Sequence, residues 1–281
     1  MTSTDVSVVI PTCDRPGSLN EAIESVRRQT ERPLETIVVD NGRQPCLDQI
    51  EHPDDIRYVR IVARAGVSQA RNSGVAHATG RWIAFLDDDD LWPPDYLSTV
   101  VAAMQGDSHV DCWITRKDQV RDGQAVPYKE PTDARLNAAT LLRVHSHAGG
   151  SNIVARKIAI ESVGGFDVRL PSGEDHFLIV DLLLNDYVVK GCGKVAALTR
   201  PPAEDDDRLN TSPTANAVKR LVRLVKYRRH LTDDVHNAWF SSALRELLPY
   251  APGATERGLM RLAAVVAKRR NAGRREEVDA F

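Results

Sequence analysis

The segment RWIAFLDDDDLWPPDYL, residues 81–97, contains an apolar run that ends abruptly in four adjacent carboxylates. Trp82 to Leu86 is typical of a buried strand, and Asp87 to Asp90 follow it directly. Pro93 then marks the start of a helix. Four neighbouring acids repel one another and resist burial, so a fold accommodates them most easily around a cation. Because Mg²⁺ is often held by one or two carboxylates plus substrate phosphates, the segment predicts a metal–diphosphate site.

A helix cap is the simpler interpretation of the same acids. An aspartate between a strand and proline-containing sequence is a common N-cap, and acids suit the first turn of a helix. This explains Asp89 or Asp90 but not Asp87 and Asp88 at the end of the strand. A capped loop therefore stays open as the alternative to a metal site.

Composition places the chain among ordinary globular proteins, with 281 residues, 42% of them hydrophobic and 27% charged. The net charge of −2 gives no overall field that favours nucleic acid, so no nucleic-acid partner is expected. The four cysteines form no CxxC pair, which argues against a zinc ribbon and fits reduced thiols. We find neither a signal peptide nor an apolar run of about 18 residues that would span a membrane, and we expect a cytoplasmic protein.

Strand-like and helix-like segments alternate in the first half of the chain. This order, with continuous apolar strands, predicts an α/β fold with a mostly parallel, Rossmann-like sheet flanked by helices. Polar residues 11–14, 40–41 and 87–90 each follow an apolar run, and parallel strands place such ends along one edge. We therefore expect these three segments to converge. The expected strands are 6–10, 34–39, 56–61, 82–86 and 109–114, and the expected helices are 17–29, 67–78 and 96–104.

The second half of the chain is less regular. It predicts helices at 134–144, 157–163 and 174–184, and short strands at 151–155, 187–189 and 195–198. We expect residues 1–200 to form the main domain and residues 201–281 a helical C-terminal extension. Basic side chains between Lys219 and Arg229 alternate with apolar ones, which is typical of a helix on an anionic membrane or of one packed on its own domain.

Several motifs together resemble the family 2 glycosyltransferases, which have the GT-A fold. The resemblance covers about residues 6–190, with the motifs in family order. They are VSVVIPT at 6–12, ESVRRQT at 24–30, VVD at 38–40, GVSQARNSG at 66–74, ATG at 78–80, FLDDDD at 85–90, GGFD at 164–167 and GED at 173–175.

This resemblance implies an inverting glycosyltransferase with a nucleoside-diphosphate sugar as donor, a UDP or dTDP sugar in our expectation. It also implies Mg²⁺ or Mn²⁺ as cofactor. Transferred residue by residue, it assigns the base to Pro11, Thr12, Asp40 and Asn41, the nucleotide to Arg71, the opening of the acidic motif to Asp87, the ribose to Asp88, the metal to Asp89 and the general base to Asp175. The chain departs from the family pattern at Cys13, where an aromatic is common, at Asn41, where aspartate is common, and at Asp181, where arginine is common.

Elementary chemistry agrees with these roles. The leaving nucleoside diphosphate gains negative charge, which a cation held by Asp89 would stabilise. The acceptor hydroxyl loses a proton as it attacks, and one carboxylate such as Asp175 can accept that proton. The acceptor itself, whether a glycan, a lipid-linked or a small molecule, is left open, as are a homo-oligomer and peripheral contact with the inner face of the membrane.

Two other function classes compete with this interpretation. A non-catalytic nucleotide-sugar or carbohydrate-binding module on the same scaffold is the main alternative, since a fold does not fix a function. A dinucleotide-dependent oxidoreductase would share the sheet pattern, but no GxGxxG motif follows the first strand.

Overall fold

The computed structural model describes residues 4–121, 124–129, 136–143, 148–200 and 213–250, together with residues 253 and 260. The chain divides into two compact units. The N-terminal unit comprises residues 1–168 and 174–205, and the C-terminal unit comprises residues 169–173 and 206–281. The short segment 169–173 therefore belongs to the same unit as the C-terminal helices, whereas the sequence predicted a single boundary after residue 200.

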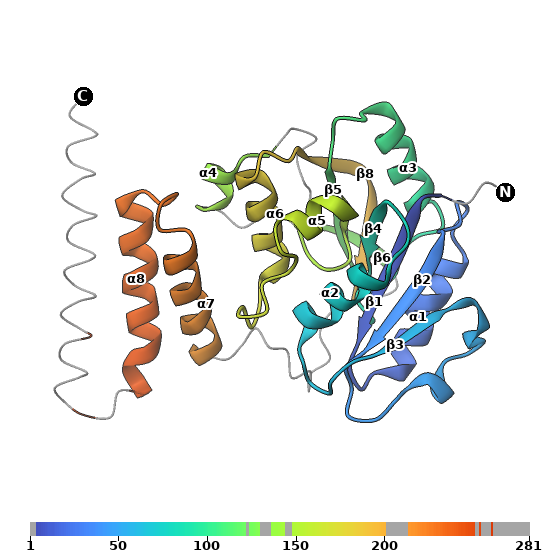
Figure 1. The fold of residues 1–281 in the computed structure, drawn as a ribbon, viewed down its shortest axis with the longest axis horizontal. Helices are drawn as coiled ribbons and strands as arrows, with labels where there is room; N and C mark the ends of the chain where they lie inside the picture. Colours follow the sequence, from blue (N-terminus) through green and yellow to red (C-terminus); the bar gives the residue numbers. More distant parts are fainter. Residues whose placement is uncertain are drawn as a thin grey trace. The chain divides into compact units, whose positions relative to one another are not determined.

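A single mixed sheet of eight strands forms the N-terminal unit, with the strand order β3-β2-β1-β4-β7-β5-β6 and β8 paired with β5. Its first four strands are parallel and lie side by side (Figure 1). These strands are β1 (Val6–Thr12), β2 (Glu35–Asp40), β3 (Arg57–Arg60) and β4 (Trp82–Phe85). The predicted α/β fold with a mostly parallel core is confirmed.

The remaining strands are β5 (Cys112–Arg121), β6 (Gln124–Lys129), β7 (Ile153–Arg156) and β8 (Val189–Thr199). β7 runs antiparallel between β4 and β5, and β6 runs antiparallel to β5. β5 begins later and continues seven residues further than the strand expected at 109–114. Its second half is polar, so hydropathy did not reveal it, and pairing with β6 and β8 holds it in the sheet.

Helices cover the sheet and connect its strands. They are α1 (Pro16–Arg27), α2 (Val67–His77), α3 (Tyr96–Gly106), α4 (Ala138–Leu141), α5 (Lys157–Ser162) and α6 (Glu174–Leu184), with short 3-10 turns at Leu47–Gln49 and Pro53–Asp55. α6 has the predicted bounds, and the others agree within a few residues except α4. That helix is shorter than the expected 134–144, of which residues 134, 135 and 144 lie outside the described part of the chain.

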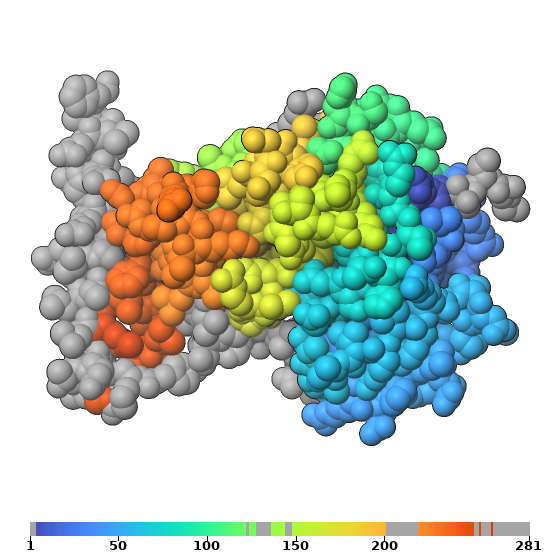
Figure 2. All heavy atoms as spheres, viewed as in Figure 1, coloured from blue at the N-terminus to red at the C-terminus, as the bar shows by residue number. Residues whose placement is uncertain are grey.

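β1 is buried along its whole length because both of its faces are covered. Val8 and Ile10 join the core that contains Leu19 and Ile23 of α1. Val9 points to the opposite face, where α2 approaches so closely that a Cβ atom at Gly74 would overlap Val9 Cγ1. Almost none of β1 is visible in the space-filling view (Figure 2). β1 and its polar end are thus covered on both faces.

The C-terminal unit contains α7 (Pro213–Lys226) and α8 (Asp233–Leu247), which pack on each other, followed by the turn Leu248–Tyr250. Tyr227 and Leu231 are buried in the connection between them. None of the helices in the described ranges is both long and apolar enough to cross a bilayer.

Two of the basic side chains of α7 contact α8. Arg220 pairs with Glu246 at 2.9 Å and donates to Ser242 Oγ. The Arg223 guanidinium lies 5.8 Å from the ring centre of Trp239. These contacts agree with a helix packed within its own unit. Contact of the same helix with a membrane stays a prediction.

Gly74→Ala is expected to destabilise the protein, because the added methyl group overlaps the buried Val9. Overpacking costs about 1–3 kcal/mol, which outweighs the roughly 1 kcal/mol that alanine gains over glycine in a helix. Urea unfolding measures the difference. Gly17→Ala in α1 is the matched control, since a Cβ atom there meets nothing within 4 Å. Equal stability of the two variants would contradict the close packing of α2 on β1.

Candidate active site

The polar ends of β1, β2 and β4 meet at one edge of the sheet, as the strand pattern predicts. Thr12 at the end of β1 is opposite Asp40 at the end of β2. The Thr12 hydroxyl also donates to Asp88 Oδ2 at 2.7 Å, although the two residues are 76 positions apart in the chain. Asp88 and Thr12 are both buried. The β1 end and the acidic motif therefore form one site.

The four acids of the motif have four different environments. Asp87 pairs with Arg71 at 2.6 Å, and Asp90 accepts a hydrogen bond from the hydroxyl of Ser151. Asp88 is buried, and the side chain of Asp89 is 27% exposed. The side chain of Asp87 is equally exposed but pairs with the buried Arg71, whereas Asp89 pairs with the half-exposed Arg15.

These environments change the pKa values of the acids. Burial raises the pKa of Asp88 to about 7, although Arg15 and the Thr12 hydroxyl act in the opposite direction. Burial also raises the pKa of Asp90 to about 7. Burial acts on Asp87 in the same sense, but Arg71 and Lys117 outweigh it and hold the pKa of Asp87 below its ordinary value. Negative charge is therefore under-compensated at Asp88 and Asp90.

A guanidinium already lies on the carboxylates that the resemblance assigns to ribose and metal. Arg15 Nη2 is 3.2 Å from Asp88 Oδ1, and Arg15 Nη1 is 2.9 Å from Asp89 Oδ2. In the described ranges, no group of three or more His, Cys, Asp or Glu side chains is arranged to hold a metal by itself. Two oxygen ligands that bind a cation, completed by a diphosphate, are nevertheless a donor set that suits Mg²⁺ or Mn²⁺. The residues present fit such an ion.

Arg71 is buried and joins three segments of the chain. Its Nη1 donates to Glu174 Oε1 and its Nη2 to Asp87 Oδ1, both at 2.6 Å. Its guanidinium also lies 5.2 Å from the ring centre of Phe166. We call this arrangement of Arg71, Asp87 and Glu174 the arginine clamp. The resemblance implies a contact between Arg71 and the nucleotide, whereas the two donors named here are directed at protein carboxylates.

Asp175, the predicted general base, follows Glu174 of the clamp in the first turn of α6. It is half-buried, and its Oδ1 accepts a hydrogen bond from the backbone N–H of His176 at 2.6 Å. Its Oδ2 lies 3.6 Å from the place that a Cβ atom would occupy at Gly149. The clamp therefore connects the element that carries Asp175 to the acidic motif.

Lys117 is a site residue that the sequence analysis did not identify. A Cβ atom at Gly149 would overlap Lys117 Nζ, so the lysine ammonium and Asp175 Oδ2 both lie beside Gly149. A Cβ atom at the neighbouring Gly150 would overlap Arg71 Nη2 and the carboxylate of Asp87. The two glycines thus allow the backbone to lie directly against four charged groups. Lys117 belongs to the polar half of β5, which no apolar pattern marked.

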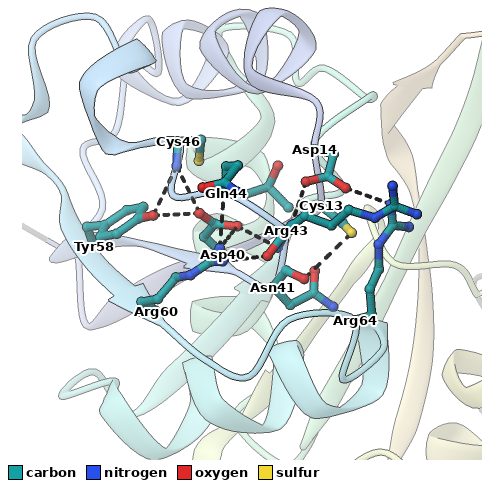
Figure 3. A network of polar contacts seen from close by, with 12 residues as sticks. Cys13, Asp14, Asp40, Asn41, Arg43, Gln44, Cys46, Tyr58, Arg60 and Arg64 are labelled. Atoms are coloured by element: carbon teal, nitrogen blue, oxygen red, sulfur yellow. Dashed lines mark hydrogen bonds and ion pairs between the residues drawn. The ribbon is translucent and has the colours of Figure 1, made fainter.

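Asp40 is surrounded by donors from its own protein (Figure 3). Its carboxylate accepts from the backbone N–H groups of Gly42 at 2.7 Å and Cys46 at 3.0 Å, and from Tyr58 Oη at 2.5 Å. Arg60 lies 2.7 Å away. Burial alone would raise the pKa of Asp40, but these hydrogen bonds outweigh it and hold the pKa below its ordinary value. Asp40 thus fixes the loop that follows β2.

Asn41 and Asp14 tie this loop to its neighbours. With the amide oriented to satisfy both contacts, Asn41 donates to the carbonyl of Thr12 at 2.6 Å and accepts from the N–H of Gly66 at 3.2 Å. Asp14 Oδ1 accepts from the N–H of Arg43 at 2.7 Å, and Asp14 Oδ2 pairs with Arg64 at 2.6 Å (Figure 3). The loops after β1, β2 and β3 are therefore held together beside the predicted base site.

The other departures from the family pattern take different places. Cys13 is half-buried, and its thiol donates to the carbonyl of Asn41 at 3.7 Å. Asp181 is buried on α6. Pro11 is buried in β1 next to Thr12. Cys13 and Pro11 thus lie beside the linked loops that follow β1, β2 and β3.

Comparison with known sequences gives the family. The family model described as Glycosyl transferase family 2 matches residues 7–164. An uncharacterized glycosyltransferase of Haemophilus influenzae is 22% identical over 63% of this chain and 62% of its own length. The glucosyl-dolichyl phosphate glucuronosyltransferase of Haloferax volcanii is 30% identical over 58% of this chain and 56% of its own length. The chain thus matches less than two thirds of the length of these relatives.

Comparison with solved structures gives the same fold. The structure of S. aureus TarS in complex with UDP-GlcNAc covers 92% of this chain and 79% of its own, with a TM-score of 0.68 and 17% identity. The mannosyltransferase PcManGT from Pyrobaculum calidifontis, in complex with GDP-Man and Mn²⁺, covers 97% of this chain and 88% of its own, with a TM-score of 0.62 and 18% identity. The fold is of the GT-A type, and since the family model matches more than half of the residues, the chain belongs to glycosyl transferase family 2.

Proposed function

We propose that this protein moves a hexose from a nucleoside-diphosphate sugar, a UDP or dTDP sugar, to an acceptor hydroxyl with inversion at the anomeric carbon. The arginine clamp carries the proposal, because Arg71 binds Asp87 of the acidic motif and Glu174, the neighbour of Asp175, at 2.6 Å each. It brings a candidate cation site and a candidate base to one place. TarS with UDP-GlcNAc and PcManGT with GDP-Man and Mn²⁺ lend support through their similar fold.

On the donor side, Asp89 would hold Mg²⁺ or Mn²⁺, which would supply positive charge to the diphosphate as it leaves, and Asp88 beside it would face the ribose. Thr12 orients Asp88 through its hydroxyl. Pro11, Thr12 and the loop that Asp40 and Asn41 fix border the base. Because the cross-linked loops set this border before the donor arrives, little ordering is required when it binds.

On the acceptor side, Asp175 accepts the proton of the attacking hydroxyl. A single inverting step needs one base and no covalent nucleophile, so a second carboxylate is not required. Lys117 Nζ lies close to the same glycine as Asp175 Oδ2, so its positive charge belongs to the acceptor side of the site. The clamp keeps Asp175 in place by fixing its neighbour Glu174.

The acceptor belongs to one of three classes: a glycan, a lipid-linked molecule or a small molecule. The name of the Haloferax relative, a glucosyl-dolichyl phosphate glucuronosyltransferase, supports the lipid-linked class. A basic amphipathic α7 would suit a cytoplasmic protein that touches the inner face of the membrane. The alternative, a binding module without turnover, is disfavoured because both the metal acid and the base are present.

Asp175→Asn should lower donor turnover about 10²–10⁴-fold, since an amide cannot accept the proton. Binding of the nucleoside diphosphate should stay within about twofold of wild type. Release of UDP or dTDP from a panel of donor sugars with Mn²⁺ measures turnover, and titration calorimetry measures binding. Asp5→Asn removes an exposed acid just before β1, at the opposite end of that strand from Thr12, and should leave both quantities unchanged. Unaltered turnover in Asp175→Asn would overturn the assignment of the base.

Arg71→Lys tests the clamp while keeping the charge. A lysine ammonium cannot reproduce the planar fork that reaches two carboxylates, so one buried acid loses its charged hydrogen bond. We expect the free energy of unfolding in urea to fall by about 1–3 kcal/mol. The initial rate of donor turnover should fall as well, because Glu174 and Asp87 are no longer held. Arg81→Lys, at an exposed ion pair with Asp5, is the control and should change neither quantity.

A further inference from the structure

Arg15 combines a fixed backbone with an exposed side chain. It occupies the N-cap position of α1, where its carbonyl accepts from the N–H of Leu19 at 3.1 Å and from Ser18 Oγ at 3.3 Å. Its side chain is 46% exposed, compared with 2% for Asp88. The guanidinium thus reaches the buried carboxylate from the solvent side, from an anchored main chain.

The two contacts of Arg15 fall on Asp89, which the proposed function assigns to the cation, and on its neighbour Asp88. Arg15 Nη2 is 3.2 Å from Asp88 Oδ1 and Arg15 Nη1 is 2.9 Å from Asp89 Oδ2. One guanidinium therefore spans two neighbouring carboxylates, one of which would hold the cation. Two cations cannot share these oxygen atoms at such distances without strong repulsion.

The guanidinium of Arg15 is half-exposed, so water can solvate it when it leaves, and a cation that arrives at Asp89 would replace its positive charge beside the buried Asp88. Planar guanidinium groups bind the oxygens of a phosphate as well as those of a carboxylate. A donor diphosphate beside a cation at Asp89 would bring such oxygens next to Arg15. The side chain therefore has a second anionic partner within reach of the same anchored backbone.

We propose that Arg15 exchanges its partners. Its guanidinium binds Asp88 and Asp89 before any ligand arrives, leaves these carboxylates when a divalent cation binds at Asp89, and then binds the diphosphate of the donor. This inference rests on the proposed function, since it requires a cation at Asp89 and a diphosphate beside it. Its consequence is that the nucleotide and the cation raise each other's affinity. When the nucleotide binds Arg15, the guanidinium no longer competes with the cation for the carboxylates.

The exchange gives Arg15→Gln two effects of opposite sign. Without nucleotide, the variant should bind Mn²⁺ about two- to fivefold more tightly than wild type, since the competing guanidinium is gone. With saturating Mn²⁺, the variant should bind UDP and dTDP roughly tenfold more weakly, since a charged phosphate contact is lost. The amount of free Mn²⁺ in electron paramagnetic resonance gives the first affinity, and titration calorimetry gives the second. A residue with a purely structural role would not move the two affinities in opposite directions.

Matched variants separate the explanations. Arg28→Gln removes the same charge from an exposed position at the C-terminal end of α1 and should bind Mn²⁺ and nucleotide like wild type. Arg15→Lys keeps the positive charge but loses the planar guanidinium. Its affinities for Mn²⁺ and for nucleotide should lie between those of wild type and Arg15→Gln. Unchanged or weaker Mn²⁺ binding by Arg15→Gln, or unchanged nucleotide binding, would overturn the exchange.

Asp89→Asn distinguishes failure of the inference from failure of the proposed function. Loss of Mn²⁺ binding in this variant, in both the wild-type and Arg15→Gln backgrounds, places the ion at the acids that Arg15 occupies and supports the exchange. Retained Mn²⁺ binding in Asp89→Asn places the ion elsewhere and overturns both the exchange and the metal site of the proposed function. Tight Mn²⁺ binding that needs Asp89 but is identical with and without Arg15 overturns the exchange alone.

Discussion

The ion pairs of the buried Arg71 fix the geometry of the candidate active site. One guanidinium binds Asp87, at the end of a parallel strand, and Glu174, at the start of α6, although the two acids are 87 positions apart. A buried carboxylate without such a partner costs several kcal/mol, so the ends of β4 and α6 cannot separate without a large penalty. The roles proposed for Asp89 and Asp175 depend on these ion pairs. Neither residue belongs to the arginine clamp, but Asp89 lies two residues after Asp87 and Asp175 directly follows Glu174.

Positive groups flank the acidic motif on both sides. Arg15 approaches Asp88 and Asp89 from the solvent, Arg71 holds Asp87 from within, and Lys117 lies on the side of Asp175. This arrangement explains how four consecutive aspartates can end a buried strand: Asp87 pairs with Arg71, Asp88 and Asp89 share Arg15, and Asp90 accepts from Ser151. The two arginines differ in exposure, since the side chain of Arg71 is 4% exposed and that of Arg15 is 46% exposed.

The sequence predicts the scaffold better than the contacts that complete the site. Apolar runs marked the parallel strands and their polar ends, so the meeting of Thr12 and Asp88 could be expected. Lys117 could not, because it lies in a polar strand that only pairing with β6 and β8 holds in the sheet. The positions of Arg15 and Arg71 depend on how loops and helices pack, which no local pattern encodes. The segment 169–173 joins the C-terminal unit for the same reason.

The base side of the site follows a different logic from the phosphate side. Asp40 and Asn41 both direct their polar atoms at protein groups, and Asp14 links the loop after β1 to Arg43 and Arg64. A carboxylate that already accepts from Tyr58 and two backbone N–H groups has little capacity left for a ligand. Under the proposed function, selectivity between bases would then depend on the shape of this fixed loop rather than on the carboxylate of Asp40. Tyr58 of β3 helps to set that shape, because its hydroxyl donates to Asp40.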